Sequence, residues 1–93
     1  MSRLSTISHI DPKNRAEIGR RLKAVRKCVG EVGETFAQAI GTSQASLSSY
    51  ENGKNAVPIR IVLCLCETYR VDANWLLLGR GQMFRVLRQA EAA

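Results

Sequence analysis

The chain has 93 residues, of which 45% are apolar and 24% charged, and its formal net charge is +6. This length holds one small domain, and the composition is that of a folded globular chain rather than a disordered one. No apolar run approaches the roughly 20 residues that a membrane-spanning helix needs, which excludes a transmembrane segment. Residues 1–11 lack the apolar stretch and cleavage site of a signal peptide, so we expect a cytoplasmic protein.

The positive charge is concentrated in one stretch. Residues 15–27 carry six Lys and Arg side chains against Glu17 alone, a local charge of +5, whereas six cations and six anions cancel from residue 28 onward. Such a stretch indicates either a polyanionic partner or a solvated helix face, and charge by itself leaves both open.

Three cysteines and one histidine match no zinc-ligand spacing, so we expect no metal site and no cofactor. Without a secretory signal, disulfides are not expected either, and the thiols are predicted to be free. We place Cys66 in the core, whereas Cys28 and Cys64 are candidates for exposure, and a redox role for these two stays open.

The predicted elements begin after a polar segment, residues 1–13, that we interpret as a flexible arm. A helix is predicted from Asn14 because apolar residues then recur at helical spacing. Gly30 and Gly33 end this helix. Its apolar stripe comprises Ile18, Leu22, Val25 and Val29.

A second, short helix carries Phe36, Ala37 and Ile40 and ends at Gly41, where a sharp turn needs a residue that tolerates positive φ. Ser43 is a good N-cap for the next helix. In that helix Leu47 and Tyr50 face inward, and a left-handed cap at Asn52-Gly53 ends it.

Pro58 is predicted to open a fourth helix at its first position. Its inward residues are expected to be Ile59, Val62, Leu65, Cys66 and Tyr69, with Ile61 and Cys64 on a different face. Asp72 caps a short fifth helix that carries Trp75, Leu76 and Leu78 and ends at Gly79. We therefore predict a domain at 14–79, followed by an extension at 80–93.

The extension holds Met83, Phe84 and Leu87, enough for one more amphipathic piece. These residues either extend a dimer interface or pack back onto the same subunit, and the sequence does not decide. No strand pattern is found.

Residues 33–52 have the spacing of a helix-turn-helix. Ala37 is small where the two helices touch, Gly41 follows at the turn, and Leu47 and Tyr50 anchor the second helix. The outer face of that helix is polar without bulk, as entry into a major groove about 12 Å wide requires. Four matches at linked spacing are more specific than any one of them.

The run SQASLSSYENGK at 43–54 and the run WLLLG at 75–79 resemble the Cro and lambda-repressor-like (XRE) family of helix-turn-helix regulators. The second run is similar to the ending of phage repressor amino-terminal domains. The resemblance implies an all-α, compact five-helix DNA-binding domain that binds a palindromic operator as a homodimer and usually represses transcription. It also implies a bacterial or phage-encoded protein, associated with the nucleoid when it is bound to double-stranded DNA, and no small-molecule ligand is indicated.

The resemblance and the position of the second helix together predict the residues that contact DNA. The amide of Gln44 suits adenine N6 and N7. Base contacts are expected from Gln44, Ala45, Ser48 and Ser49. Backbone contacts are expected from Glu34, Thr35, Ser43, Asn52, Lys54, Asn55, Arg20, Lys23 and Lys27.

The sequence departs from the family at the start of the motif. Members often carry Gln there, which touches a phosphate and braces the first residue of the next helix, whereas this chain has Gly33 followed by Glu34. A carboxylate suits a helix N-terminus but repels a phosphate brought to the same place.

Two other classes of function are weighed against DNA-binding regulation. An antitoxin uses such a fold mainly to hold a toxin, and a long extension ordered by its partner would be its sign; about fourteen residues follow Gly79. An enzyme needs an acid–base constellation. The one histidine, His9, lies in the predicted arm and no carboxylates pair in an apolar setting, so we expect no catalysis.

Overall fold

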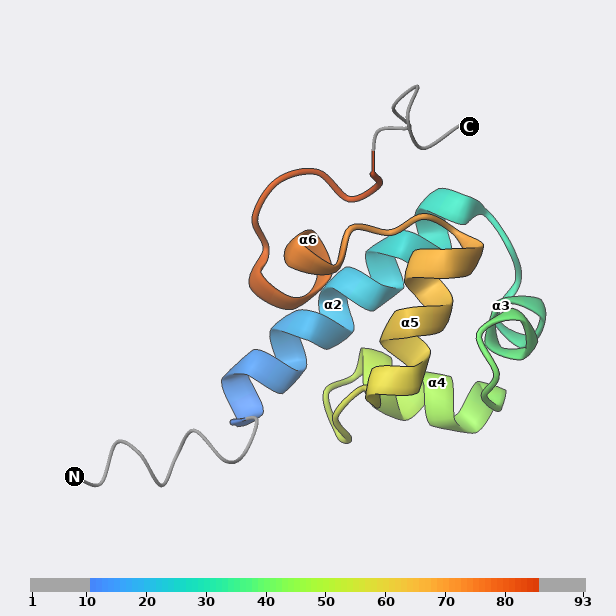
Figure 1. The fold of residues 1–93 in the computed structure, drawn as a ribbon. Coiled ribbons are helices and arrows are strands. Elements are labelled where there is room, and N and C mark those ends of the chain that lie inside the picture. Colours follow the sequence, from blue (N-terminus) through green and yellow to red (C-terminus); the bar gives the residue numbers. More distant parts are fainter. Residues whose placement is uncertain (1–10, 86–93) are drawn as a thin grey trace.

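The computed structural model describes residues 11–85, and within this range the chain forms five α-helices (Figure 1). They are α2 (Pro12–Val29), α3 (Gly33–Ala39), α4 (Gln44–Glu51), α5 (Ile59–Thr68) and α6 (Ala73–Leu78). The all-α, five-helix fold expected from the sequence is confirmed for this part of the chain. None of these helices is long and apolar enough to cross a membrane.

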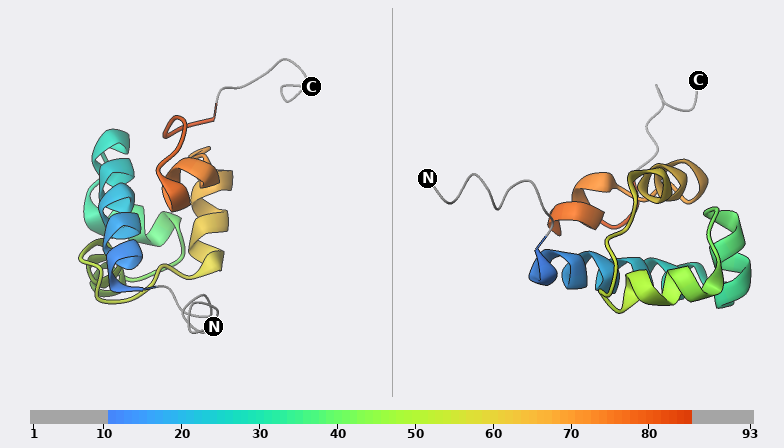
Figure 2. Two further views of the ribbon diagram at one scale, coloured as in Figure 1. Left: turned by 90° about the vertical axis from the view of Figure 1, so that its left-hand side faces the viewer. Right: turned by 90° about the horizontal axis from the view of Figure 1, so that it is seen from below.

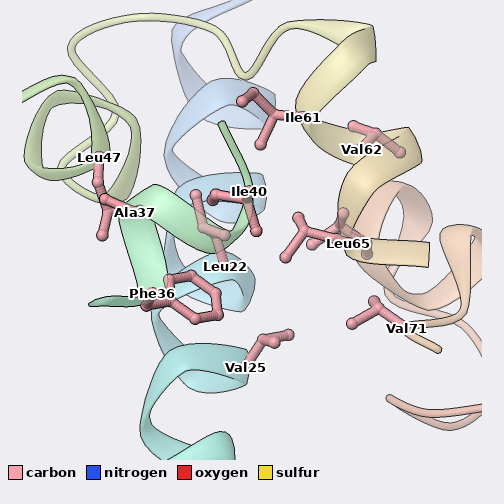
Figure 3. Packing of buried hydrophobic residues seen from close by; sticks show 11 residues of the cluster. Leu22, Val25, Phe36, Ala37, Ile40, Leu47, Ile61, Val62, Leu65 and Val71 are labelled. Atoms are coloured by element: carbon pink, nitrogen blue, oxygen red, sulfur yellow. The ribbon is translucent and has the colours of Figure 1, made fainter. Parts of the chain in front are cut away.

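The helices form two layers around one apolar core. α2 and α4 lie side by side in one layer, α5 and α6 lie in the other, and α3 closes one end (Figure 2). Phe36 is fully buried at the centre and its ring stacks on Tyr69, with the ring centroids 5.3 Å apart. The buried cluster (Figure 3) comprises Leu22, Val25, Phe36, Ala37, Ile40, Leu47, Ile61, Val62, Leu65, Val71 and Leu76.

The first helix starts two residues earlier than the sequence predicts. The Asp11 carboxylate accepts a hydrogen bond from the Asn14 backbone N–H at 2.8 Å, and Pro12 occupies the first helical position, where no N–H is needed. Residues 12 and 13 therefore belong to α2, and residues 1–10 of the predicted arm lie outside the described range. The helix ends at Gly30, whose φ of 83° confirms the predicted stop.

The turn between α3 and α4 is formed as predicted. Gly41 has a φ of 81°, and the Thr42 N–H donates to the Ala37 carbonyl at 2.9 Å. The Ser43 Oγ then accepts from the Ser46 N–H at 3.1 Å, which caps α4. Gly53, with a φ of 74°, follows the end of α4.

The orientation of α5 corrects two predictions. Ile59 is 69% exposed although it was expected inside, and Ile61, expected on a different face, is fully buried. The reason is that α5 turns residues 61, 62 and 65 toward α2 and α3, and Ile59 lies about 110° away from that stripe at 100° per residue. Pro58 is the N-cap of α5 rather than its first residue.

The two cysteines of α5 flank the buried stripe. Cys64 and Cys66 are both half-buried and pack against the core cluster, so Cys66 is less buried than expected. Cys28 on α2 is exposed. All three thiols are free, and burial raises the pKa of the Cys66 thiol.

The segment after α6 packs back onto the same chain. Asp72 caps α6 as predicted, accepting from the Asn74 N–H at 2.8 Å, and Gly79 ends it with a φ of 74°. Residues 80–85 form no helix; instead Phe84 makes an isolated antiparallel bridge with Val71. The positive φ of Gly81 is incompatible with a continuing helix.

Met83 and Phe84 are half-buried against the core cluster of the same chain, while their role in a dimer interface stays a prediction. Leu87 lies outside the described residues.

Candidate nucleic-acid interface

The outward face of α4 is neutral, polar and short-chained. Leu47 is 2% exposed and anchors the helix in the core, while Tyr50 is half-buried, as the sequence predicts. Of the predicted base-contacting residues, Gln44, Ala45 and Ser48 are exposed, and Ser49 is half-buried. Such a face fits a major groove without steric obstruction.

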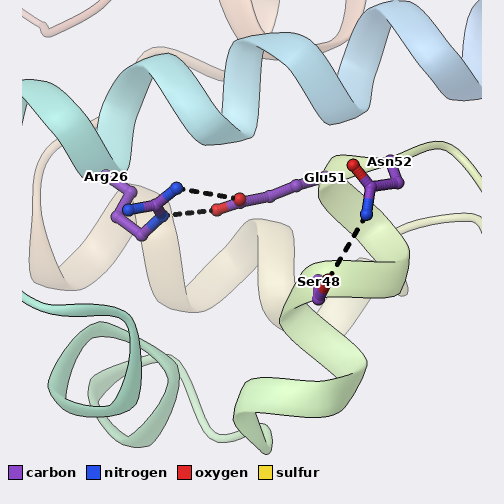
Figure 4. Close-up of polar contacts among 4 residues, drawn as sticks. All are labelled: Arg26, Ser48, Glu51 and Asn52. Atoms are coloured by element: carbon purple, nitrogen blue, oxygen red, sulfur yellow. Dashed lines mark hydrogen bonds and ion pairs between the residues drawn. The ribbon is translucent and has the colours of Figure 1, made fainter.

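Two polar side chains on this face are joined to each other. The Asn52 amide Nδ2 donates to the Ser48 Oγ at 3.3 Å, one helical turn apart (Figure 4). Because Ser48 accepts this bond, its own hydroxyl hydrogen remains able to donate to a base edge. Asn52 keeps its amide oxygen as an acceptor.

α4 is fixed to α2 by an ion pair that sequence reasoning missed. The Arg26 guanidinium donates from Nε to Glu51 Oε2 at 2.7 Å and from Nη2 to Oε1 at 3.0 Å (Figure 4). This bidentate geometry is among the stronger protein hydrogen bonds. It neutralises the one charged residue of α4, which would otherwise repel a polyanion.

Two further arginines hold the segments on either side of α4. The Arg60 Nη1 donates to the Gly41 carbonyl at 2.8 Å, before the helix, and the Arg15 Nε donates to the Gly53 carbonyl at 2.8 Å, after it. Each satisfies a backbone carbonyl that has no helical partner. No periodicity in the sequence indicates these contacts.

The helices α2 and α4 approach each other at Gly19. A Cβ at this position would run into the carbonyl oxygens of Tyr50 and Glu51. Only glycine therefore permits this packing of the two backbones, which sequence analysis did not identify. The basic stretch and the predicted groove-entering helix are thus neighbours in space.

The structure divides the six cations of residues 15–27 into two groups. Arg15, Arg21 and Arg26 hydrogen-bond within the chain; Arg21 donates from Nε to the Leu76 carbonyl at 2.7 Å, at the end of α6. Arg20, Lys23 and Lys27 are exposed, and helical spacing places them on one stripe of α2. Three of the six cations in this stretch therefore make hydrogen bonds within the fold, and the other three are exposed to solvent.

The other predicted backbone-contacting residues are also accessible. Glu34 and Thr35 are exposed in the first turn of α3. Ser43, Asn52, Lys54 and Asn55 are exposed at the two ends of α4, although the Ser43 oxygen is occupied by its capping bond. The structure thus brings most of the predicted residues to one region around α4, while the α2 stripe lies beside it.

No group of His, Cys, Asp and Glu side chains within residues 11–85 is arranged to hold a metal ion.

Comparison with known proteins agrees with this geometry. Residues 17–76 match a family model described as a helix-turn-helix domain. Antitoxin PezA of Streptococcus pneumoniae is 35% identical over 55 residues, which is 59% of this chain. The match covers 35% of the length of that relative. No solved structure matches the chain.

Proposed function

Since the chain belongs to the Cro and lambda-repressor-like (XRE) helix-turn-helix family, we propose that it is a sequence-specific transcriptional repressor. It binds a palindromic operator in double-stranded DNA as a homodimer, and α4 enters the major groove. Binding within a promoter excludes RNA polymerase. No catalytic step is part of this function.

The observation that carries the proposal is the combination of a neutral outer face with rigid support behind it. Gln44, Ala45 and Ser48 point outward from a helix anchored by Leu47 and by the Arg26–Glu51 ion pair. Side chains that read base edges need a helix backbone held in a fixed position, because hydrogen-bond discrimination depends on alignment.

We assign base contacts to Gln44, Ala45, Ser48 and Ser49. Phosphate contacts position the protein without reading sequence. We assign them to Thr35, Ser43, Asn52, Lys54, Asn55, Arg20, Lys23 and Lys27, and to the backbone N–H of Glu34, whose carboxylate must point away from the phosphate. If about four phosphates are neutralised, the log–log dependence of affinity on salt has a slope near −3.6, at about −0.9 per contact.

The test is selection of bound duplexes from a random library at about 150 mM salt, which suppresses nonspecific binding. An enriched palindrome supports the proposal. Its half-sites should lie about 10 base pairs apart, centre to centre, or a multiple of that distance, because both copies of α4 must meet the same face of the DNA. Enrichment of a single half-site without its inverted repeat would contradict binding as a dimer. It would not contradict the proposal that α4 contacts the bases.

A second candidate function rests on the similarity to Antitoxin PezA. In this alternative the chain is an antitoxin, and its main function is to bind a protein toxin. The same selection discriminates between the two candidates, since recovery of only unrelated or AT-rich duplexes favours partner binding. A pull-down with the immobilised chain would then identify the partner.

A further inference from the structure

The side chain of Gln44 lies directly over Gly33, the first residue of α3. A Cβ built on Gly33 would be 3.2 Å from Gln44 Nε2, 3.7 Å from Cδ and 3.8 Å from Cγ. The absence of a side chain at position 33 thus makes the space that the Gln44 carboxamide occupies. A methyl group there would press on the amide nitrogen.

The space continues into a surface hollow of about 220 Å³ between α2, α3 and α4. It is lined by Arg26, Gly33, Gln44, Leu47, Ser48 and Glu51. Arg26 and Glu51 are bonded to each other and Ser48 accepts from Asn52. None of the side-chain hydrogen bonds within residues 11–85 involves the Gln44 carboxamide. Its position is therefore set by packing alone, with room to move.

We propose that Gly33 is a specificity-determining residue that acts through Gln44. This inference rests on the proposed function, in which Gln44 reads a base. A bidentate contact with adenine requires the amide oxygen and the amide nitrogen to be aligned together. Because Gly33 leaves the carboxamide room to shift and rotate, Gln44 tolerates more than one base at its position, and a side chain at position 33 narrows this tolerance.

The test is Gly33→Ala, measured on the selected operator and on its single-base-pair variants. Gly33 has no positive φ and begins a helix, so alanine fits its backbone. The three heavy atoms nearest to the new methyl group all belong to the flexible side chain of Gln44. The base pair that Gln44 reads is the one at which Gln44→Ala abolishes the base preference. At this base pair, Gly33→Ala should raise the ratio of the Kd for the worst base to the Kd for the best base about threefold or more. At the other base pairs of the operator, this ratio should change by less than about twofold.

The double variant Gly33→Ala with Gln44→Ala separates this effect from a change in the fold. If Gly33 acts through Gln44, the added methyl group changes no base preference once Gln44 is absent. Gln38→Ala, on an exposed position of the same helix, is the control and leaves all preferences unaltered. Gly33→Ser repeats the test with a second small side chain.

The inference is overturned if the preference at that base pair stays the same or falls in Gly33→Ala. An equal change at every base pair, or an effect that persists without Gln44, overturns it as well. If the wild-type chain selects no sequence at all, the proposed function fails instead, so the two failures are distinguishable.

Discussion

Arg26 of α2 and Glu51 of α4 are joined by two hydrogen bonds, although they lie 25 positions apart in the chain. Their side chains are 23% and 9% exposed, so solvent screens the pair only partly. The hydrogen bond to Glu51 raises the pKa of Arg26, which keeps the guanidinium charged. The pair couples the basic helix to the helix that we propose enters the groove.

Arg26→Ala is therefore expected to lower the free energy of unfolding by about 1–3 kcal/mol, because the Glu51 carboxylate loses its partner while mostly buried. Urea denaturation measures the change. Adding Glu51→Gln should recover part of the loss, and Lys23→Ala, at an exposed position, should stay within about 0.5 kcal/mol of wild type. Strict additivity of the two substitutions would contradict the coupling.

Gln44→Ala should weaken binding to the selected operator by about 1–3 kcal/mol and relax the preference at one base pair, since the bidentate amide is lost. Affinity for random DNA should be nearly unchanged. Titration of labelled duplexes in parallel provides both values. A uniform loss on specific and random DNA would show that Gln44 positions the protein rather than reads a base.

Lys54→Ala should weaken binding to all sequences alike, because a phosphate contact carries no sequence information. The slope of log affinity against log salt should become shallower by about 0.9. The measurement is a salt series on one specific and one random duplex. An unchanged slope would mean that Lys54 lies away from the DNA.

Ile61→Ala should lower the free energy of unfolding by about 2–5 kcal/mol, because a fully buried side chain leaves a cavity. Ile59→Ala, only two positions away, should change it by less than about 0.5 kcal/mol because Ile59 is 69% exposed. Thermal or urea unfolding of both variants tests the orientation of α5. Similar losses in the two variants would contradict it.

The contribution of Tyr69 to the free energy of unfolding depends on pH in the alkaline range. Its hydroxyl donates to the Glu31 carboxylate, and burial together with this bond raises the pKa of Tyr69 to about 12. The ordinary value is about 10. Because the folded-state pKa is the higher one, the stabilisation is complete below about pH 10 and is lost as the pH rises through about 12.

Phenolate absorbance follows this titration directly. Glu31→Gln should lower the pKa of Tyr69 but not return it to the ordinary value, because the contribution of burial remains. Tyr69→Phe should remove the late-titrating signal. A wild-type chain in which Tyr69 titrates near pH 10 would contradict the prediction.

Local signals in the sequence predicted most helix ends. Ser43 and Asp72 cap α4 and α6, and Gly30, Gly41 and Gly79 end their helices at positive φ, all as expected. Each of these depends on one residue and its immediate neighbours, so the sequence contains the whole signal. The Asp11 cap was missed because the adjacent proline was interpreted as a boundary of the arm.

The candidate interface was predictable in part. The outward positions Gln44, Ala45 and Ser48 follow from the spacing of Leu47 and Tyr50, because a helix with one anchored face exposes the other. The arginine contacts were not predictable, since Arg15, Arg26 and Arg60 reach partners that are 19 to 38 positions away. Composition alone does not distinguish an arginine that hydrogen-bonds within the fold from one that is free to contact a DNA phosphate.

Five helices, their approximate ends and the polar face of α4 can be derived from the amino-acid sequence, because they follow from local hydrogen bonding and periodicity. The buried face of α5, the close approach of α2 to α4 at Gly19 and the engagement of particular cations within the fold depend on contacts between distant segments. A pattern with isoleucine at both 59 and 61 fits two orientations equally well. Packing against α2 and α3 selects one of them, because only one orientation fills the space between the two layers.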